Sequence, residues 1–199
     1  MSSEPRSRLN PDERRAQLVA IGVNFLAEHP LGELTIDDLA SRAGVSKALI
    51  FHYFDSRQGV ERAIVTTARD SLLAATEPRA ELPPRERIHE TLLRTAAFVR
   101  DHSGTFSSLV RGIASGDPAV RAIVDEAREQ SAIRLREAFL ELGTPDAPAL
   151  RTALRSWVSF AEETFLELVV DRRTDDVAVV EFLERTLDAV VAASHDARF

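Results

Sequence analysis

The side chains best suited to chemistry in this sequence lie close together between residues 46 and 57, and they suit nucleic-acid binding. They comprise cations, hydroxyls, an imidazole and apolar surface: Ser46, Lys47, Leu49, Phe51, His52, Tyr53 and Arg57. Such a set can hold DNA phosphates and make a few contacts to base edges. The alternative is a structural helix pair whose polar face meets only solvent. The residue types alone leave both interpretations open.

The residues before this cluster predict a short helix followed by a tight turn. Thr35 predicts an N-cap, and Asp38 three residues later completes a pair that resembles a capping box. Apolar residues then recur at helical spacing up to Ala43. Gly44 follows at once, and glycine can adopt the left-handed conformation that ends a helix without a steric penalty.

A second short helix is predicted over residues 47–54. Ser46 is a suitable N-cap for it. Ile50 and Phe54 are four residues apart, so they share one face and would seal the crossing with the helix before. The two helices and their turn predict a helix-turn-helix, in which the second helix enters the DNA major groove.

The stretch from Ala43 to Arg57 resembles the DNA-binding signature of TetR/AcrR-family transcriptional regulators. It reads Ala-Gly-Val-Ser-Lys-Ala-Leu-Ile-Phe-His-Tyr-Phe-Asp-Ser-Arg. The resemblance covers about residues 11–75, and the rest of the chain matches the family in length and helical character. It implies that Lys47, Ala48 and Leu49 face DNA bases. It also implies a set of phosphate contacts: Thr35, Ser46, Phe51, His52, Tyr53 and Arg57.

Two positions depart from the family pattern. Phe51 stands where the family usually has tyrosine, so a phenolic contact to phosphate would be lost. Asp37 stands where some members place a basic DNA contact, which an aspartate cannot supply. Both departures bear on sequence preference rather than on DNA binding itself.

Composition and charge limit the class of protein. The 199 residues carry a net charge of −7, with 44% hydrophobic residues and no cysteine. Disulfides and thiolate metal sites are therefore excluded. Residues 41–62 carry +2, which leaves −9 for the rest and suits a DNA-facing tip on an acidic body. No apolar run is long enough for a membrane span and no signal-peptide pattern is present, so we expect no membrane partner and a cytoplasmic location.

The whole chain predicts an all-α fold of about nine helices. Residues 1–10 predict a disordered tail, and Asn10-Pro11 starts the first helix. Residues 11–76 predict a DNA-binding head of three helices, including the helix-turn-helix, with a long connecting helix. Three prolines within residues 77–84 mark the boundary with a body over residues 77–199, for ligand binding and dimerisation. The connecting helix would be either a lever or a passive connector.

The last two predicted helices carry too much apolar surface for one inner stripe. A helix that is apolar nearly all round must be buried nearly all round. We therefore expect a homodimer through these helices, as the family resemblance also implies. The alternative is a monomer in which both helices are central to the core.

A regulator of this kind needs a signal, and the resemblance implies a small molecule inside the body. Aromatic walls with a few polar groups suit a hydrophobic or amphipathic ligand. The candidate ligand-binding residues are Phe98, Phe106, Arg111, Phe139, Trp157, Phe160, Glu163 and Thr164. For each aromatic residue the alternative is ordinary core packing.

No catalytic or metal-binding constellation is found in the sequence. The five histidines lack metal-ligand spacing, and adjacent acidic pairs on a helix diverge by about 100°. The sequence therefore predicts a homodimeric, ligand-responsive DNA-binding regulator, a repressor, with no enzymatic activity and no cofactor. The alternatives are a helical small-molecule-binding protein without an operator, and a regulator without a ligand.

Overall fold

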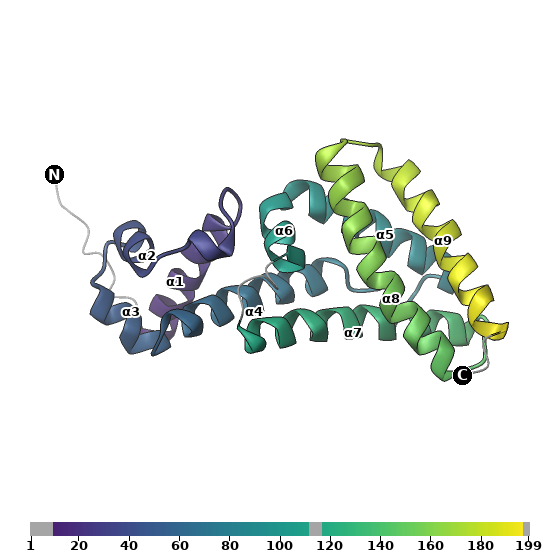
Figure 1. Ribbon diagram of the computed structural model, residues 1–199, viewed down its shortest axis with the longest axis horizontal. Coiled ribbons are helices and arrows are strands. Elements are labelled where there is room, and N and C mark those ends of the chain that lie inside the picture. Colours follow the sequence, from purple (N-terminus) through teal and green to yellow (C-terminus); the bar gives the residue numbers. More distant parts are fainter. Residues whose placement is uncertain (1–9, 112–116, 197–199) are drawn as a thin grey trace.

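A computed structural model describes residues 10–111 and 117–196 of the chain. Within these ranges it holds nine α-helices and no strand, so the predicted all-α class is confirmed. The molecule is elongated, with the three N-terminal helices at one end and the later helices at the other (Figure 1). The predicted disordered tail lies outside the described residues, apart from Asn10.

Side-chain caps define the three N-terminal helices: α1 Pro11–Phe25, α2 Ile36–Ala43 and α3 Lys47–Phe54. Asn10 and Glu13 form a capping box at α1. Thr35 and Asp38 form a second one at α2, as predicted. Gly44 ends α2 with a φ of 64°, which is the left-handed conformation that favours glycine. Ile50 and Phe54 are buried, so the helix-turn-helix is closed by the residues that the sequence indicated.

The long helix α4, Arg57–Ala75, leaves this head and runs beside α7, Pro118–Glu141 (Figure 1). Leu72 of α4 packs against both buried clusters of the molecule. The cluster of the head also includes Leu109, Val120 and Val124, which belong to α6 and α7. The head core is therefore completed by side chains from beyond the proline-rich boundary.

The remaining helices are α5 Pro84–Asp101, α6 Ser103–Arg111, α8 Pro148–Phe165 and α9 Asp176–Asp196. Two of the differences from the prediction concern the start of α6 and the end of α8. The sequence predicts a break at His102-Ser103-Gly104 and a shorter helix over residues 105–114, whereas α6 already begins at Ser103. The second difference is a π-helical turn, Leu166–Asp171, in place of regular helix at the end of α8.

Gly104 shows why α6 can begin so early. A Cβ atom at this position would overlap the backbone carbonyl oxygens of Leu26 and Ala27, just after α1. The glycine therefore permits close approach of α6 to the head, rather than ending a helix. This contact is one of the places where head and body meet.

Candidate DNA-binding surface and ligand cavity

Helix α3 presents its polar and apolar side chains on an accessible face. Lys47, Ala48, Phe51 and His52 are exposed, and Phe51 is 44% exposed despite its aromatic ring. Leu49 and Tyr53 are less accessible, and Tyr53 is half-buried and packs against the head core. The rings of His52 and Tyr53 lie edge to face, with centroids 5.4 Å apart. An exposed large ring at the tip of a head that otherwise buries its apolar residues suits contact with another molecule.

Three of the predicted phosphate contacts also hold the head together. The Thr35 hydroxyl accepts a hydrogen bond from the Asp38 backbone N–H at 3.0 Å, and the Ser46 hydroxyl accepts one from Leu49 at 3.2 Å. Arg57 Nε donates to Glu61 Oε1 at 2.8 Å. Its Nη2 donates to the Gly32 carbonyl oxygen at 3.0 Å. The Thr35 hydroxyl donates to Asp38, but the Ser46 hydroxyl can still donate its hydrogen, and Arg57 keeps N–H groups that neither Glu61 nor Gly32 uses.

The sole lysine of the chain is paired across the helix-turn-helix. Lys47 Nζ at the start of α3 forms an ion pair with Asp37 Oδ1 at the start of α2. Both side chains are more than half exposed, so the pair is screened by water and easily exchanged. Asp37 is one of the two family departures noted in the sequence, and here it lies against the predicted base-facing cation.

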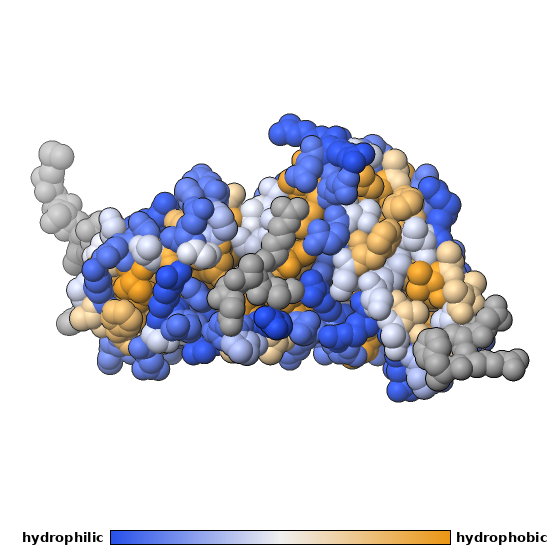
Figure 2. Space-filling model, in the orientation of Figure 1, coloured by the Kyte–Doolittle hydropathy of each residue, from blue (hydrophilic) through white to orange (hydrophobic). Residues whose placement is uncertain are grey.

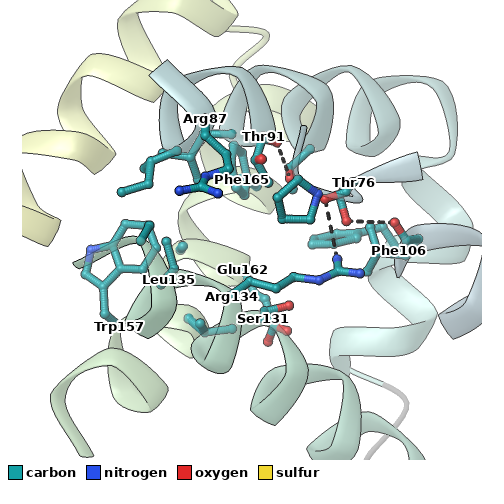
Figure 3. A pocket seen from close by; sticks show the side chains of 18 residues that line it. Thr76, Arg87, Thr91, Phe106, Ser131, Arg134, Leu135, Trp157, Glu162 and Phe165 are labelled. Atoms are coloured by element: carbon teal, nitrogen blue, oxygen red, sulfur yellow. Dashed lines mark hydrogen bonds between the residues drawn. The ribbon is translucent and has the colours of Figure 1, made fainter. Parts of the chain in front are cut away.

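The body contains a cavity bounded by α4, α5, α6, α7 and α8 (Figure 3). It encloses about 780 Å³ of space, part of which opens to solvent. Its apolar walls include Leu92, Phe106, Leu135, Trp157 and Phe165. A mainly apolar lining with a few polar groups is of a composition suited to an organic ligand.

Charged side chains that line the cavity are held by partners. Arg134 Nη1 donates to the Leu73 carbonyl oxygen at 3.2 Å, and its Nη2 pairs with Glu77. Glu162 Oε2 accepts from Arg128 Nε at 2.7 Å. Burial raises the pKa of the Glu162 carboxyl, while the charge of Arg128 opposes that shift. Arg87 Nη2 donates to Glu141 Oε2 at 2.7 Å.

Two of the eight predicted ligand-binding residues, Phe106 and Trp157, line this cavity. Five of the other predicted residues do not line it: Phe98, Phe139, Phe160, Glu163 and Thr164. Phe139 is buried under the Arg85 guanidinium, and Phe160 is 43% exposed. Arg111 ends α6, but its side chain lies outside the described residues.

Most of the cavity lining was missed from the sequence, including the polar residues Arg87, Thr91, Arg134 and Glu162. On α8 the sequence analysis chose Glu163, but its neighbour Glu162 lies about 100° away and faces inward. Arg87 and Thr91 are four residues apart, beside the buried Ile88 and Leu92. A polar pair at helical spacing along an apolar stripe is the signal that could have found them.

Helices α8 and α9 lie side by side at the far end of the molecule and leave apolar rings at the surface. Phe160 is 43% exposed and Phe182 is 38% exposed, with ring centroids 6.2 Å apart. Apolar surface is visible over these two helices in Figure 2. Adjacent exposed phenyl rings on neighbouring helices are typical of a surface that another protein covers.

A helix-turn-helix head joined to an all-helical body with a cavity is typical of one class of protein, the DNA-binding transcriptional regulators with a separate helical domain. Two family models match this chain. "Bacterial regulatory proteins, tetR family" matches residues 18–64, and "Tetracyclin repressor-like, C-terminal domain" matches residues 84–193. The chain belongs to the TetR family of transcriptional regulators.

Individual relatives agree with this assignment. A TetR-family transcriptional regulator from Streptomyces coelicolor has a crystal structure with a TM-score of 0.78 at 30% identity, covering 94% of this chain and 83% of that one. The transcriptional regulator EthR of Mycobacterium tuberculosis is 29% identical over 93 residues, which are 47% of this chain and 43% of EthR. The transcriptional activator FasR of Mycolicibacterium smegmatis is 26% identical over 125 residues, 62% of this chain and 57% of FasR. The chain thus aligns with about half the length of these curated relatives.

None of the helices in the described ranges combines the length and apolar composition that crossing a bilayer requires.

Proposed function

We propose that this protein is a homodimeric, ligand-responsive DNA-binding regulator, and specifically a repressor. The observation that carries the proposal is the accessible face of α3, where Lys47, Phe51 and His52 project from a capped, well-packed helix-turn-helix. A recognition helix held in this way can enter a major groove. The protein would act by binding rather than by catalysis, and in the cytoplasm.

DNA binding would combine phosphate contacts with limited base contact. Lys47, His52, Tyr53 and Arg57 would hold phosphates, and Ala48 with Leu49 would make apolar contacts to bases. Arg57 would keep its bond to Glu61 and offer its remaining N–H groups. Contacts of this kind release counterions from DNA, so affinity should fall steeply with salt.

The experiment is capture of genomic fragments by the purified protein at two salt concentrations, followed by sequencing. We expect a palindromic site that is recovered less well at high salt. The double variant Lys47→Ala/Tyr53→Phe should lose affinity for that site and have a shallower salt dependence. If affinity and salt slope both remain unchanged, α3 is not the DNA-binding element and the proposal is wrong.

A homodimer through α8 and α9 would bury the exposed rings of Phe160 and Phe182. Two-fold symmetry would then place two α3 helices on half-sites about 34–36 Å apart. Phe160→Asp should yield monomers in sedimentation experiments at micromolar concentration. Leu142→Asp is the matched control, because Leu142 is also exposed, at 41%, but lies at the end of α7. Equal effects of the two substitutions would contradict this interface.

The ligand response would pass through α4. Leu72 and Thr76 at its C-terminal end line the cavity, and Val60 and Ile64 nearer its start are buried in the head core. A ligand that fits better when α4 is tilted would favour a dimer with mis-spaced recognition helices. Such coupling requires that the ligand bind the two states with different affinity.

Two alternatives have distinct outcomes. One relative, FasR, is named an activator, so the sign of regulation must be measured with a reporter gene downstream of the recovered site. A helical binding protein without an operator would bind a small molecule saturably and recover no DNA after refolding free of ligand.

A further inference from the structure

The cavity wall formed by α5 holds two buried polar atoms that have no hydrogen-bond partner among the described residues. They are Arg87 Nε and Thr91 Oγ1. The two residues are four apart on one helix, so their side chains share a face. Both line the cavity, and Figure 3 shows them on the same side of it, across from Arg134 and Glu162.

This arrangement is unusual because buried polar atoms are nearly always paired, and leaving one unpaired costs free energy. A threonine in a helix commonly donates to the carbonyl oxygen four residues earlier. Thr95 does so, to Thr91 at 2.8 Å, but Thr91 itself does not. Because both atoms line the cavity, a molecule bound there could supply the missing partner.

The type of partner follows from the two atoms. Arg87 Nε is a donor only, and the Thr91 hydroxyl can donate as well. Together they call for an acceptor, such as the oxygens of a carboxylate or a carbonyl group. An amine would meet a donor it cannot pair with, beside two guanidinium groups of the lining, those of Arg87 and Arg134.

The only carboxyl group in the described lining gives a cation little help. Glu162 already accepts a charge-assisted hydrogen bond from Arg128 at 2.7 Å. Burial also raises its pKa, which weakens it further as a counter-ion. The other hydroxyls of the lining, those of Thr76, Thr95 and Ser131, already donate to backbone carbonyl oxygens. The remaining walls are apolar, so we expect the rest of the ligand to be mainly apolar.

We propose that the effector is an apolar molecule with a carboxylate or carbonyl oxygen at one end, held by Arg87 Nε–H and Thr91 Oγ–H. Its apolar part would lie against Leu92, Phe106, Leu135, Trp157 and Phe165. The inference rests on the proposed ligand response and specifies the chemical class of ligand.

The chain carries its own reporter for this site. Trp157 is the only tryptophan in the sequence and lines the cavity. Its emission can be titrated in the full-length, ligand-free protein with three sets of straight-chain probes of matched length, from hexyl to tetradecyl. These are the carboxylic acids, their methyl esters and the corresponding alkylamines. Acids and esters distinguish a charged from an uncharged acceptor.

Thr91→Val removes the unpartnered hydroxyl with little change of shape. It should weaken binding of the best acid or ester about tenfold, which is the scale of a hydrogen bond to a charged or buried group. Thr95→Val is the matched control, since Thr95 also lines the cavity but its hydroxyl is occupied. It should change affinity less than about threefold.

Each outcome decides the inference. Saturable binding of an acid or ester that Thr91→Val weakens and Thr95→Val does not supports it. Amines that bind as tightly as acids and esters, equal effects of the two valine substitutions, or no response to any acid or ester overturn it.

The proposed function is tested separately, by retention of operator DNA. Acid binding without DNA release would keep the ligand class and remove the ligand response. DNA release by an unrelated compound, with no acid or ester binding, would keep the ligand response and remove the proposed ligand class.

Discussion

The head and the body of this protein differ in how their polar groups are satisfied. The buried side-chain polar atoms without a partner, among the residues described, are on Arg87, Thr91, Asp117 and Asp176, all beyond the head. In the head, caps and ion pairs occupy the corresponding groups. The head is therefore complete as folded, whereas the body has a cavity wall that lacks a partner. This difference is what one expects if a rigid DNA-binding head is joined to a body that binds a ligand, as proposed.

The two regions also differ in how far apart in the sequence their paired side chains lie. Many pairs in the head join residues three or four apart, such as Thr35 with Asp38, although the bonds of Lys47 to Asp37 and of Arg57 to Gly32 reach further along the chain. The pairs around the cavity span 34 residues for Arg128 and Glu162, and 54 for Arg87 and Glu141. Local pairs can form as each helix forms, while distant pairs depend on the whole fold.

The largest effect is expected where the two regions touch. Gly104→Ala places a Cβ against the carbonyl oxygens of Leu26 and Ala27. Alanine favours a helix over glycine by up to about 1 kcal/mol, but backbone overlap of this kind costs more. We expect a net loss of about 1–3 kcal/mol in the free energy of unfolding, measured by denaturant titration.

Gly32→Ala is the control for this substitution. Apart from Gly32 itself and its two chain neighbours, no atom of the described structure lies within 4 Å of the Cβ that alanine would add there. Its effect should stay within about 0.5 kcal/mol. A Gly104 variant as stable as the control would mean that the head does not pack on α6 as described.

A second substitution tests whether the ion pair between Lys47 and Asp37 weakens the binding of DNA by the head. Asp37→Asn removes the partner of Lys47 and a negative charge from the face of the head that is proposed to bind DNA. One more phosphate contact should steepen the salt slope by about 0.9 and raise affinity for DNA about fivefold to tenfold. The measurement is fluorescence anisotropy with operator DNA over a series of salt concentrations. An unchanged slope would show that Lys47 already exchanges its partner at no cost.

The contrast between local and distant pairing explains why the head helices could be predicted from the sequence and most of the cavity lining could not. The caps Asn10, Thr35, Ser46 and Ser56 lie within a few residues of the groups they satisfy, so the head helices follow from local spacing. The cavity depends on helix phase across five elements. An error of one residue, as between Glu162 and Glu163, turns a side chain from the cavity to the surface.

The π-helical turn at Leu166–Asp171 shows the same limit. Such a turn adds a residue to one helical turn and shifts the phase of the residues after it. Propensity and apolar spacing indicated regular helix there, because neither reports which packing neighbours will be present. Phe160 was likewise predicted to line the cavity because it is one of the aromatic residues of the body, although it lies on an exposed side of α8.

The unpaired hydroxyl of the cavity wall leads to a prediction about stability without ligand. Thr91→Val should raise the free energy of unfolding by about 1 kcal/mol, because an unsatisfied buried hydroxyl is replaced by a methyl group. Thr95→Val should leave stability unchanged or lower it, since that hydroxyl is paired. Thermal unfolding of the two ligand-free variants gives the comparison. A destabilised Thr91 variant would indicate that the hydroxyl has a partner in solution.

The smallest expected effect concerns a solvent-exposed ion cluster that joins α7 to α8. Asp146 accepts hydrogen bonds from Arg136 Nε at 2.8 Å and from Arg151 Nη2 at 2.6 Å. These bonds hold the pKa of the Asp146 carboxyl well below its usual range. A folded-state pKa below the unfolded value of about 3.9 means that the unfolded state binds the proton more readily. The stabilisation is therefore present above about pH 4 and is lost as the pH falls further.

Asp146→Asn should accordingly be slightly less stable than the parent protein at neutral pH, with the difference shrinking as the pH falls below about 4. Salt should shrink it too, because the cluster is exposed to solvent. The check is the unfolding temperature as a function of pH at low and high ionic strength. Asp171→Asn is the control, as Asp171 is exposed and forms no ion pair with any described residue. If the two variants show the same dependence on pH, the arginine pair does not act on Asp146. The junction between α7 and α8 would then depend on its buried apolar contacts alone.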